Sequence, residues 1–156
     1  MKKRIPKAKV FFIIIFSIAL FGCNGTIEDK IVDNIKNNCR QYPCLVRMNK
    51  LTDFSWDKVY VFGDAVSDAQ IEQTVSTKVP DKKNEFARTI VFTKEDKVVY
   101  YEELPTDIEG MVKNQLTFDN VEPTTYKSYA VENAAFEIVQ SIHGGIPTYH
   151  FEQKGQ

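Results

Sequence analysis

The sequence predicts an α+β fold, with a mainly antiparallel sheet on which an N-terminal helix and one further short helix pack. Three observations lead to this prediction. Isoleucines recur at helical spacing after Thr26, an apolar segment with strand alternation ends at Gly63, and several β-rich runs separated by turn residues fill the second half of the chain.

The beginning of the chain has the organisation of an export signal. Five basic residues and no acidic one precede the apolar run Val10–Phe21, which is 12 residues long. As a helix this run would rise about 18 Å, whereas the hydrocarbon core of a bilayer is about 30 Å thick. A basic start followed by an apolar run of this length is typical of a secretory signal peptide, so we expect residues 1–22 to be removed. An uncleaved membrane anchor is the alternative.

The apolar run ends in Leu20-Phe21-Gly22-Cys23, and here the sequence resembles the precursor of a bacterial lipoprotein. Leu20, Gly22 and Cys23 match the lipobox of that family, whereas Phe21 departs from the small or β-branched residue that is usual there. The resemblance implies that diacylglycerol is attached to the sulfur of Cys23, that the chain is cleaved before Cys23, and that the new amino terminus is acylated in many bacteria. Two or more acyl chains anchor a protein stably. A buried, unmodified cysteine is the alternative.

The expected organisation is a signal peptide (1–22), a lipid anchor with a short tether (23–26) and a single domain (27–156). Asn24 stands where lipoproteins retained in the inner membrane commonly have aspartate. The resemblance therefore implies an outer-membrane location facing the periplasm if the cell is Gram-negative. Residues 23–156 carry 15 basic and 21 acidic side chains, a formal charge of −6, which argues against nucleic acid as a partner.

The first expected element of the domain is a helix that Thr26 caps. Ile27, Ile31 and Ile35 form its apolar stripe, and we expect it to end near Asn38 and Cys39.

Cys39 and Cys44 are an even pair in an exported chain once Cys23 is lipidated, and this predicts a disulfide between them. Pro43 favours a turn or extended backbone in the intervening segment, so the two can meet. Two alternatives stay open. The cysteines can be free and buried, or they can take part in redox or metal chemistry, for which C-x₄-C is not the expected spacing.

Strands and one short helix are expected next, in chain order. Cys44–Lys50 alternates as a strand does, and Leu51–Gly63 predicts a central strand covered on both faces, with Phe54, Trp56, Tyr60 and Phe62 on one parity. Ser67 and Gln70 form a capping box for the short helix, followed by a loop over 77–85. The remaining predictions are a hairpin of 87–92 and 98–101 with a turn at 93–97, a capped turn at 106–111, a strand at 115–118, and strands at 135–142 and 147–151 joined at Gly144-Gly145.

The segment Leu51–Gly63, with the Val91–Tyr101 hairpin after it, resembles a group of small exported bacterial proteins that often carry the pattern Thr-Asp-Phe-x-Trp-Asp-Lys-x-Tyr-x-Phe-Gly. This resemblance covers about a third of the chain, is a marker of fold, and transfers no functional residues.

Candidate chemical groups are few. Asp53 and Asp57 have the same strand parity and can divide acid and base roles, although turn formation and local ion pairing also account for them. His143 beside Gly144-Gly145 lies on an expected turn, and His150 is an expected cross-strand neighbour. We find no nucleophile elbow, no phosphate-binding glycine loop and no familiar zinc spacing, so we predict no catalytic residue, no metal and no cofactor.

The sequence therefore predicts a non-enzymatic, lipid-anchored envelope protein that binds a protein partner, of an immunity, inhibitor or accessory type. Complementary charge would favour a basic partner. Six aromatic residues supply core or interface area: Trp56, Tyr100, Tyr101, Tyr126, Tyr129 and Tyr149. The alternative is a lipoprotein that binds a small envelope ligand such as a lipid or glycan fragment. A wide apolar pocket would favour this alternative, and an acidic patch rimmed with tyrosine would favour a protein partner.

Overall fold

The computed structural model describes residues 25–84, 86–104 and 115–153. The signal peptide, Cys23, Asn24 and the turn expected at 106–111 lie outside the described residues. In chain order the described elements are α1 (Ile27–Asn38), β1 (Cys44–Arg47), the 3₁₀ helix η1 (Met48–Lys50), β2 (Lys58–Phe62), α2 (Asp68–Val75), β3 (Arg88–Lys94), β4 (Lys97–Leu104), β5 (Gln115–Phe118), β6 (Tyr126–Ala130), β7 (Ala135–His143) and β8 (Ile146–Gln153).

The described strands form two sheets of four strands each. The first sheet has the order β1-β7-β8-β5 and the second sheet the order β4-β3-β2-β6. All neighbouring pairs are antiparallel except β5 and β8, which are parallel. The expected α+β fold with a mainly antiparallel arrangement is confirmed, but the strands divide between two sheets.

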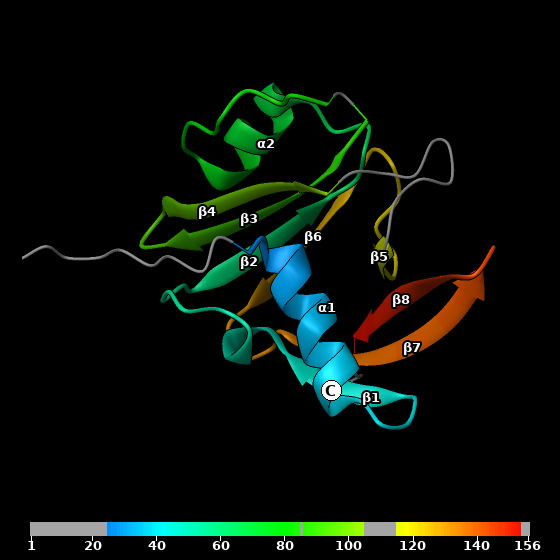
Figure 1. The fold of residues 1–156 in the computed structure, drawn as a ribbon. Helices are drawn as coiled ribbons and strands as arrows, with labels where there is room; N and C mark the ends of the chain where they lie inside the picture. Colours follow the sequence, from blue (N-terminus) through cyan, green and yellow to red (C-terminus); the bar gives the residue numbers. More distant parts are fainter. Residues whose placement is uncertain (1–24, 85, 105–114, 154–156) are drawn as a thin grey trace, which may run out of the picture.

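Two clusters of buried side chains lie on opposite faces of the second sheet. The main cluster joins α1, the inner face of the second sheet and the first sheet, and a smaller cluster lies beneath α2. Figure 1 shows the same layering, with α2 on one side of the second sheet and with α1 and the first sheet on the other. In β2, Val59 and Val61 enter the main cluster, while Phe62 enters the smaller one. The predicted central strand with two covered faces is confirmed for β2.

The sequence predicts α1 well. The Thr26 hydroxyl accepts a hydrogen bond from the Asp29 amide at 3.0 Å, and the Asp29 carboxylate accepts one from the Thr26 amide at 3.2 Å. This capping box satisfies two of the amides that a helix start leaves unpaired. At the other end, Cys39 forms a disulfide with Cys44, so the predicted pair is confirmed and joins the end of α1 to the start of β1.

The strand expected at Leu51–Gly63 is wrong in its first half, because β2 begins only at Lys58. The chain turns at η1 instead, where the Leu51 amide donates to the Met48 carbonyl at 3.0 Å. The Thr52 hydroxyl then accepts a hydrogen bond from the Trp56 indole at 3.0 Å. Such short-range side-chain bonds compete with strand pairing. As a result Trp56 lies in the main cluster and not on the Tyr60 face that its parity predicts.

Two further differences concern β-structure. The sequence does not predict β6, because Tyr126, Lys127 and Ser128 are all exposed and show no alternation of apolar residues. The hairpin of β3 and β4 is confirmed, but its turn is only Glu95-Asp96, with φ of 48° and 58°. Positive φ at both residues is the backbone that a two-residue hairpin of type I′ requires.

Candidate functional site

The segment 77–84 lies beside α2 and is held by carboxylates from two other elements. The Lys82 amide donates to the Asp68 carboxylate of α2 at 2.9 Å. The amides of Lys83 and Asn84 each donate to one oxygen of the Glu103 carboxylate of β4, both at 2.9 Å. Hydrogen bonds to a charged acceptor are stronger than neutral ones, so the predicted loop is fixed in place on α2 and β4.

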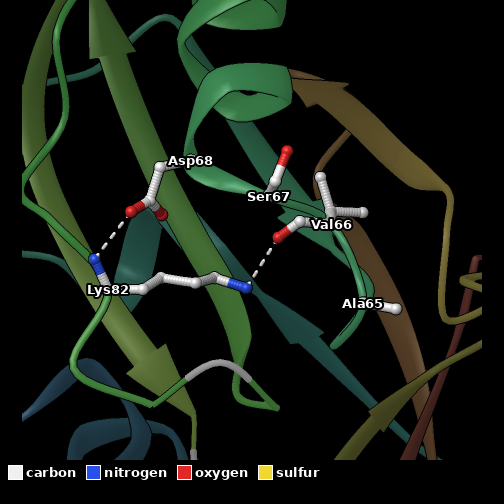
Figure 2. A pocket seen from close by; sticks show the side chains of 5 residues that line it. All are labelled: Ala65, Val66, Ser67, Asp68 and Lys82. Carbon is white, nitrogen blue, oxygen red and sulfur yellow. Dashed lines mark hydrogen bonds between the residues drawn. The ribbon is translucent and has the colours of Figure 1, made fainter.

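The side chain of Lys82 crosses a pocket of about 320 Å³ lined by Ala65, Val66, Ser67, Asp68 and Lys82. Its ammonium group donates to the carbonyl of Val66 at 2.8 Å, which Figure 2 shows, and to the carbonyl of Ala87 at 3.1 Å. Burial lowers the pKa of Lys82, although the carboxylates of Asp68, Glu103 and Asp64 act in the opposite direction. Because its ammonium group donates hydrogen bonds to the backbone carbonyls of Val66 and Ala87, Lys82 holds these two parts of the chain together.

A second pocket, which we call the acidic pocket, is lined in part by the same segment. It has a volume of about 270 Å³ and is lined by Pro80, Asp81, Lys83, Tyr101, Glu102 and Glu103. Burial raises the pKa of Tyr101 to about 12, and the nearby carboxylates of Glu103, Asp68 and Asp81 act in the same direction. The pocket thus brings the carboxylates of Asp81 and Glu103 close to a tyrosine that stays protonated at neutral pH, whereas the carboxylate of Glu102, the next residue along β4, lies on the other face of the sheet with the Tyr100 hydroxyl.

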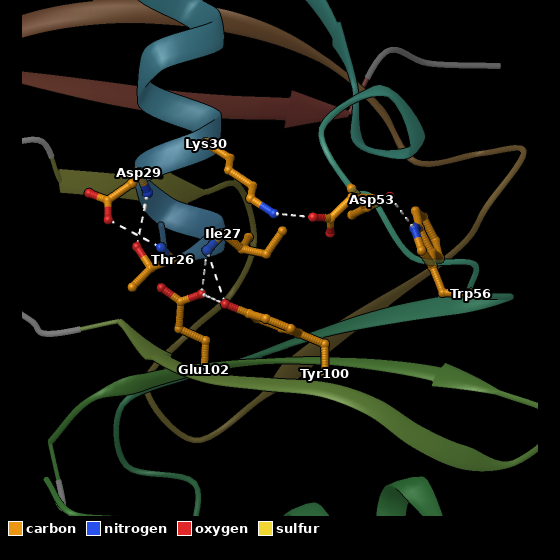
Figure 3. A network of polar contacts seen from close by, with 9 residues as sticks. Thr26, Ile27, Asp29, Lys30, Asp53, Trp56, Tyr100 and Glu102 are labelled. Carbon is orange, nitrogen blue, oxygen red and sulfur yellow. Dashed lines mark hydrogen bonds and ion pairs between the residues drawn. The ribbon is translucent and has the colours of Figure 1, made fainter. Parts of the chain in front are cut away.

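Glu102 also caps the first turn of α1, as Figure 3 shows. Its carboxylate accepts hydrogen bonds from the Ile27 amide at 2.7 Å and from the Tyr100 hydroxyl at 2.6 Å. A carboxylate at the start of a helix satisfies unpaired amides and interacts favourably with the helix dipole. Glu102 therefore joins the beginning of α1 to β4, from a position 75 residues further along the chain.

Glu28 lies in this first turn and provides a prediction about pH. Burial, the Glu102 carboxylate and the Asp29 carboxylate, in that order, raise the pKa of Glu28 to about 7. A carboxyl group whose pKa is higher in the folded than in the unfolded chain loses its favourable contribution to stability as the pH rises from about 4.5 to about 7. Glu28→Gln should therefore raise the free energy of unfolding by about 1 kcal/mol at pH 8, after allowance for solvent screening, and change it little at pH 4.

Thermal unfolding of Glu28→Gln at both pH values checks this. Asp33→Asn is the matched control, since it removes an exposed carboxylate from the same helix. Equal stabilisation by Glu28→Gln at pH 4 and pH 8 would contradict the assignment.

The structure gives Asp53 and Asp57 separate roles. Asp53 forms an ion pair with Lys30 at 3.0 Å, and the Asp57 carboxylate accepts a hydrogen bond from the Glu95 amide at 2.8 Å. Both partners lie far along the chain, 23 residues from Asp53 and 38 from Asp57, so neither bond is the local turn or the local ion pair that the sequence left open. His143 ends β7 immediately before Gly144-Gly145, whose φ values are 57° and 84°, so the predicted turn is confirmed.

His150 lies in a row of polar side chains across three strands. Its Nδ1 is 2.6 Å from the Thr117 hydroxyl of β5, and its Nε2 is 2.9 Å from the Ser141 hydroxyl of β7. Sequence reasoning does not single out Ser141 or Thr117. Their proximity to His150 depends on the parallel pairing of β5 with β8 and on the register of β7 with β8.

The aromatic residues divide between core and surface. Tyr129 and Tyr149 are buried with Trp56 in the main cluster, and Tyr100 packs against that cluster. Tyr101 lines the acidic pocket, and Tyr126 is 46% exposed. Most of the six aromatic residues therefore stabilise the fold, and Tyr101 is the tyrosine that lies beside the carboxylates of the acidic pocket.

Comparison with protein-family models, with curated proteins and with solved structures finds no match. Within the described residues, no helix is long and apolar enough to span a membrane, and no group of three or more His, Cys, Asp or Glu side chains is placed to hold a metal ion.

Proposed function

We propose that this protein is a non-enzymatic lipoprotein of the cell envelope that binds a basic protein partner. The observation that carries the proposal is the acidic pocket, in which the carboxylates of Asp81 and Glu103 lie near Tyr101. A lysine or arginine side chain of the partner would place its cationic group among these carboxylates and its aliphatic stem against the tyrosine.

The charge of the whole domain supports the same partner chemistry. Residues 23–156 have a formal charge of −6, and complementary charge raises the rate and selectivity of association. Within the pocket, the Glu103 carboxylate is already fixed by hydrogen bonds from the amides of Lys83 and Asn84, whereas Asp81 is exposed. Preorganised carboxylates reduce the ordering cost of binding.

Asp81→Lys is the sharpest variant for this proposal. Affinity capture from detergent-solubilised envelopes, with the lipidated protein as bait, would first identify the partner. Asp81→Lys should then weaken binding of that partner at least tenfold at low ionic strength, mainly through a slower association rate. Asp33→Lys makes the same change in net charge on α1 and is the control. A partner without a basic contact surface, or equal weakening by both variants, would count against the acidic pocket.

The membrane anchor is tested separately. Mass spectrometry of the membrane fraction should find a mature chain that begins at Cys23 and carries added acyl mass, and Cys23→Ala should leave an uncleaved precursor. A soluble mature product, or one that retains residues 1–22, would refute the lipoprotein proposal without bearing on the acidic pocket.

Binding of a small envelope ligand is the competing function, and the observation that favours it is the pocket that the Lys82 side chain crosses. Its lining combines the Ser67 hydroxyl, the Asp68 carboxylate and the Lys82 ammonium with two small apolar side chains, which suits a hydroxyl-rich glycan fragment. Capture of a glycan instead of a protein in the same experiment would support this alternative.

A further inference from the structure

The polar row of Ser141, His150 and Thr117 lies on one face of the first sheet. His150 is directly opposite Thr117 in the parallel pairing of β5 and β8, and directly opposite Val139 in the pairing of β7 and β8. Ser141 is two residues beyond Val139, so its side chain lies on the same face. All three polar side chains are half-buried. Three neighbouring strands therefore hold the row in a fixed geometry.

The contacts of the Thr117 hydroxyl are compatible with the tautomer of His150 that can accept a proton from Ser141. The Thr117 hydroxyl lies 3.3 Å from the Tyr149 carbonyl, to which it can donate, and 2.6 Å from His150 Nδ1, from which it accepts when the imidazole carries its proton on Nδ1. In that tautomer Nε2 carries no proton and is the acceptor for the Ser141 hydroxyl, which lies 2.9 Å away. A serine that donates to an imidazole whose other nitrogen is held by a third group has the arrangement of an activated nucleophile.

From this geometry we propose that Ser141 accepts an acyl group from activated esters, with His150 as the general base and Thr117 as a positioning residue. Ser141 Oγ forms a bond to the ester carbonyl carbon while its proton passes to His150 Nε2. The bond from that carbon to the leaving oxygen breaks, and the leaving alcohol takes the proton from Nε2. The products are a Ser141 ester and the free alcohol, and the imidazole returns to its starting state.

The test uses two probes on the full-length protein in detergent, followed by peptide mapping. p-Nitrophenyl acetate should acetylate Ser141 and release one equivalent of p-nitrophenol. A fluorophosphonate should form a bond from phosphorus to Ser141 Oγ with loss of fluoride. His150→Gln should slow both reactions about 100-fold, as expected for loss of a general base.

Matched variants separate activation from structure. Thr117→Val should slow the reaction about tenfold, and Thr117→Ser should restore it, because the hydroxyl that orients the imidazole is kept. Ser128→Ala removes an exposed serine of β6 and should leave the rate unchanged. Modification of other residues in place of Ser141 in the wild-type protein, or an unchanged rate in folded His150→Gln, would overturn the proposal. The wild-type mapping decides the matter even where a variant fails to fold.

Discussion

Trp56→Ala is expected to lower the free energy of unfolding by about 3 to 5 kcal/mol, which is the usual cost of truncating a large aromatic side chain in a core. Trp56 is 5% exposed, and its ring contacts that of Phe92 edge to face at a centroid distance of 5.1 Å. Its indole N–H is paired with the Thr52 hydroxyl. Truncation therefore leaves a cavity in the main cluster and removes a partner from a polar group as well.

Denaturant unfolding followed by circular dichroism measures this effect. Leu45→Ala is the control, because Leu45 is 51% exposed and surface substitutions usually change stability by less than about 0.5 kcal/mol. A loss of that small size for Trp56→Ala, together with loss of partner capture, would mean that Trp56 acts at an interface and not in the core.

Trp56 also illustrates how far the sequence predicts the fold. Its burial follows from its size and apolar surroundings, so the core prediction is correct. Its parity argument fails, because alternation predicts a face only where the chain is extended, and η1 and the Thr52 bond interrupt the strand before Lys58. Local patterns with one interpretation, such as the helix cap at Thr26 and the capping box at Ser67, are predicted to the residue.

The candidate sites depend on contacts between distant parts of the chain, and this limits what the sequence predicts of them. The acidic pocket forms because Glu103 binds amides about 20 residues earlier in the chain and brings Asp81 beside Tyr101. The polar row of Ser141, His150 and Thr117 depends on the parallel pairing of β5 with β8. Neither the contact of Glu103 with these amides nor the pairing of β5 with β8 is encoded in a short sequence motif. The sequence predicts only that the domain is acidic and that it contains several tyrosines.

Gly63→Ala is expected to destabilise the fold nearly as much as Trp56→Ala does. The cause is an added methyl group without space, whereas Trp56→Ala leaves a cavity. Gly63 follows β2, and a methyl group at this position would meet the backbone carbonyl groups of Glu122 and Pro123. The two chain segments are joined there by hydrogen bonds from the Gly63 amide to the Thr125 carbonyl at 2.8 Å and from the Ala65 amide to the Pro123 carbonyl at 2.9 Å. A backbone carbonyl cannot rotate away as a flexible side chain can, so these bonds must lengthen or break.

Overpacking of this kind usually costs about 1 to 3 kcal/mol, and we expect Gly63→Ala to lie at the upper end of that range. Gly25→Ala is the matched control, because the nearest heavy atom to a new methyl group there is the Asp29 Cβ at 3.8 Å, an ordinary contact distance. The control should change the unfolding midpoint little, while Gly63→Ala should lower it by several degrees and increase hydrogen exchange at the amides of Gly63 and Ala65. If the two variants unfold at the same midpoint, the close approach of residues 122–125 to the end of β2 is wrong.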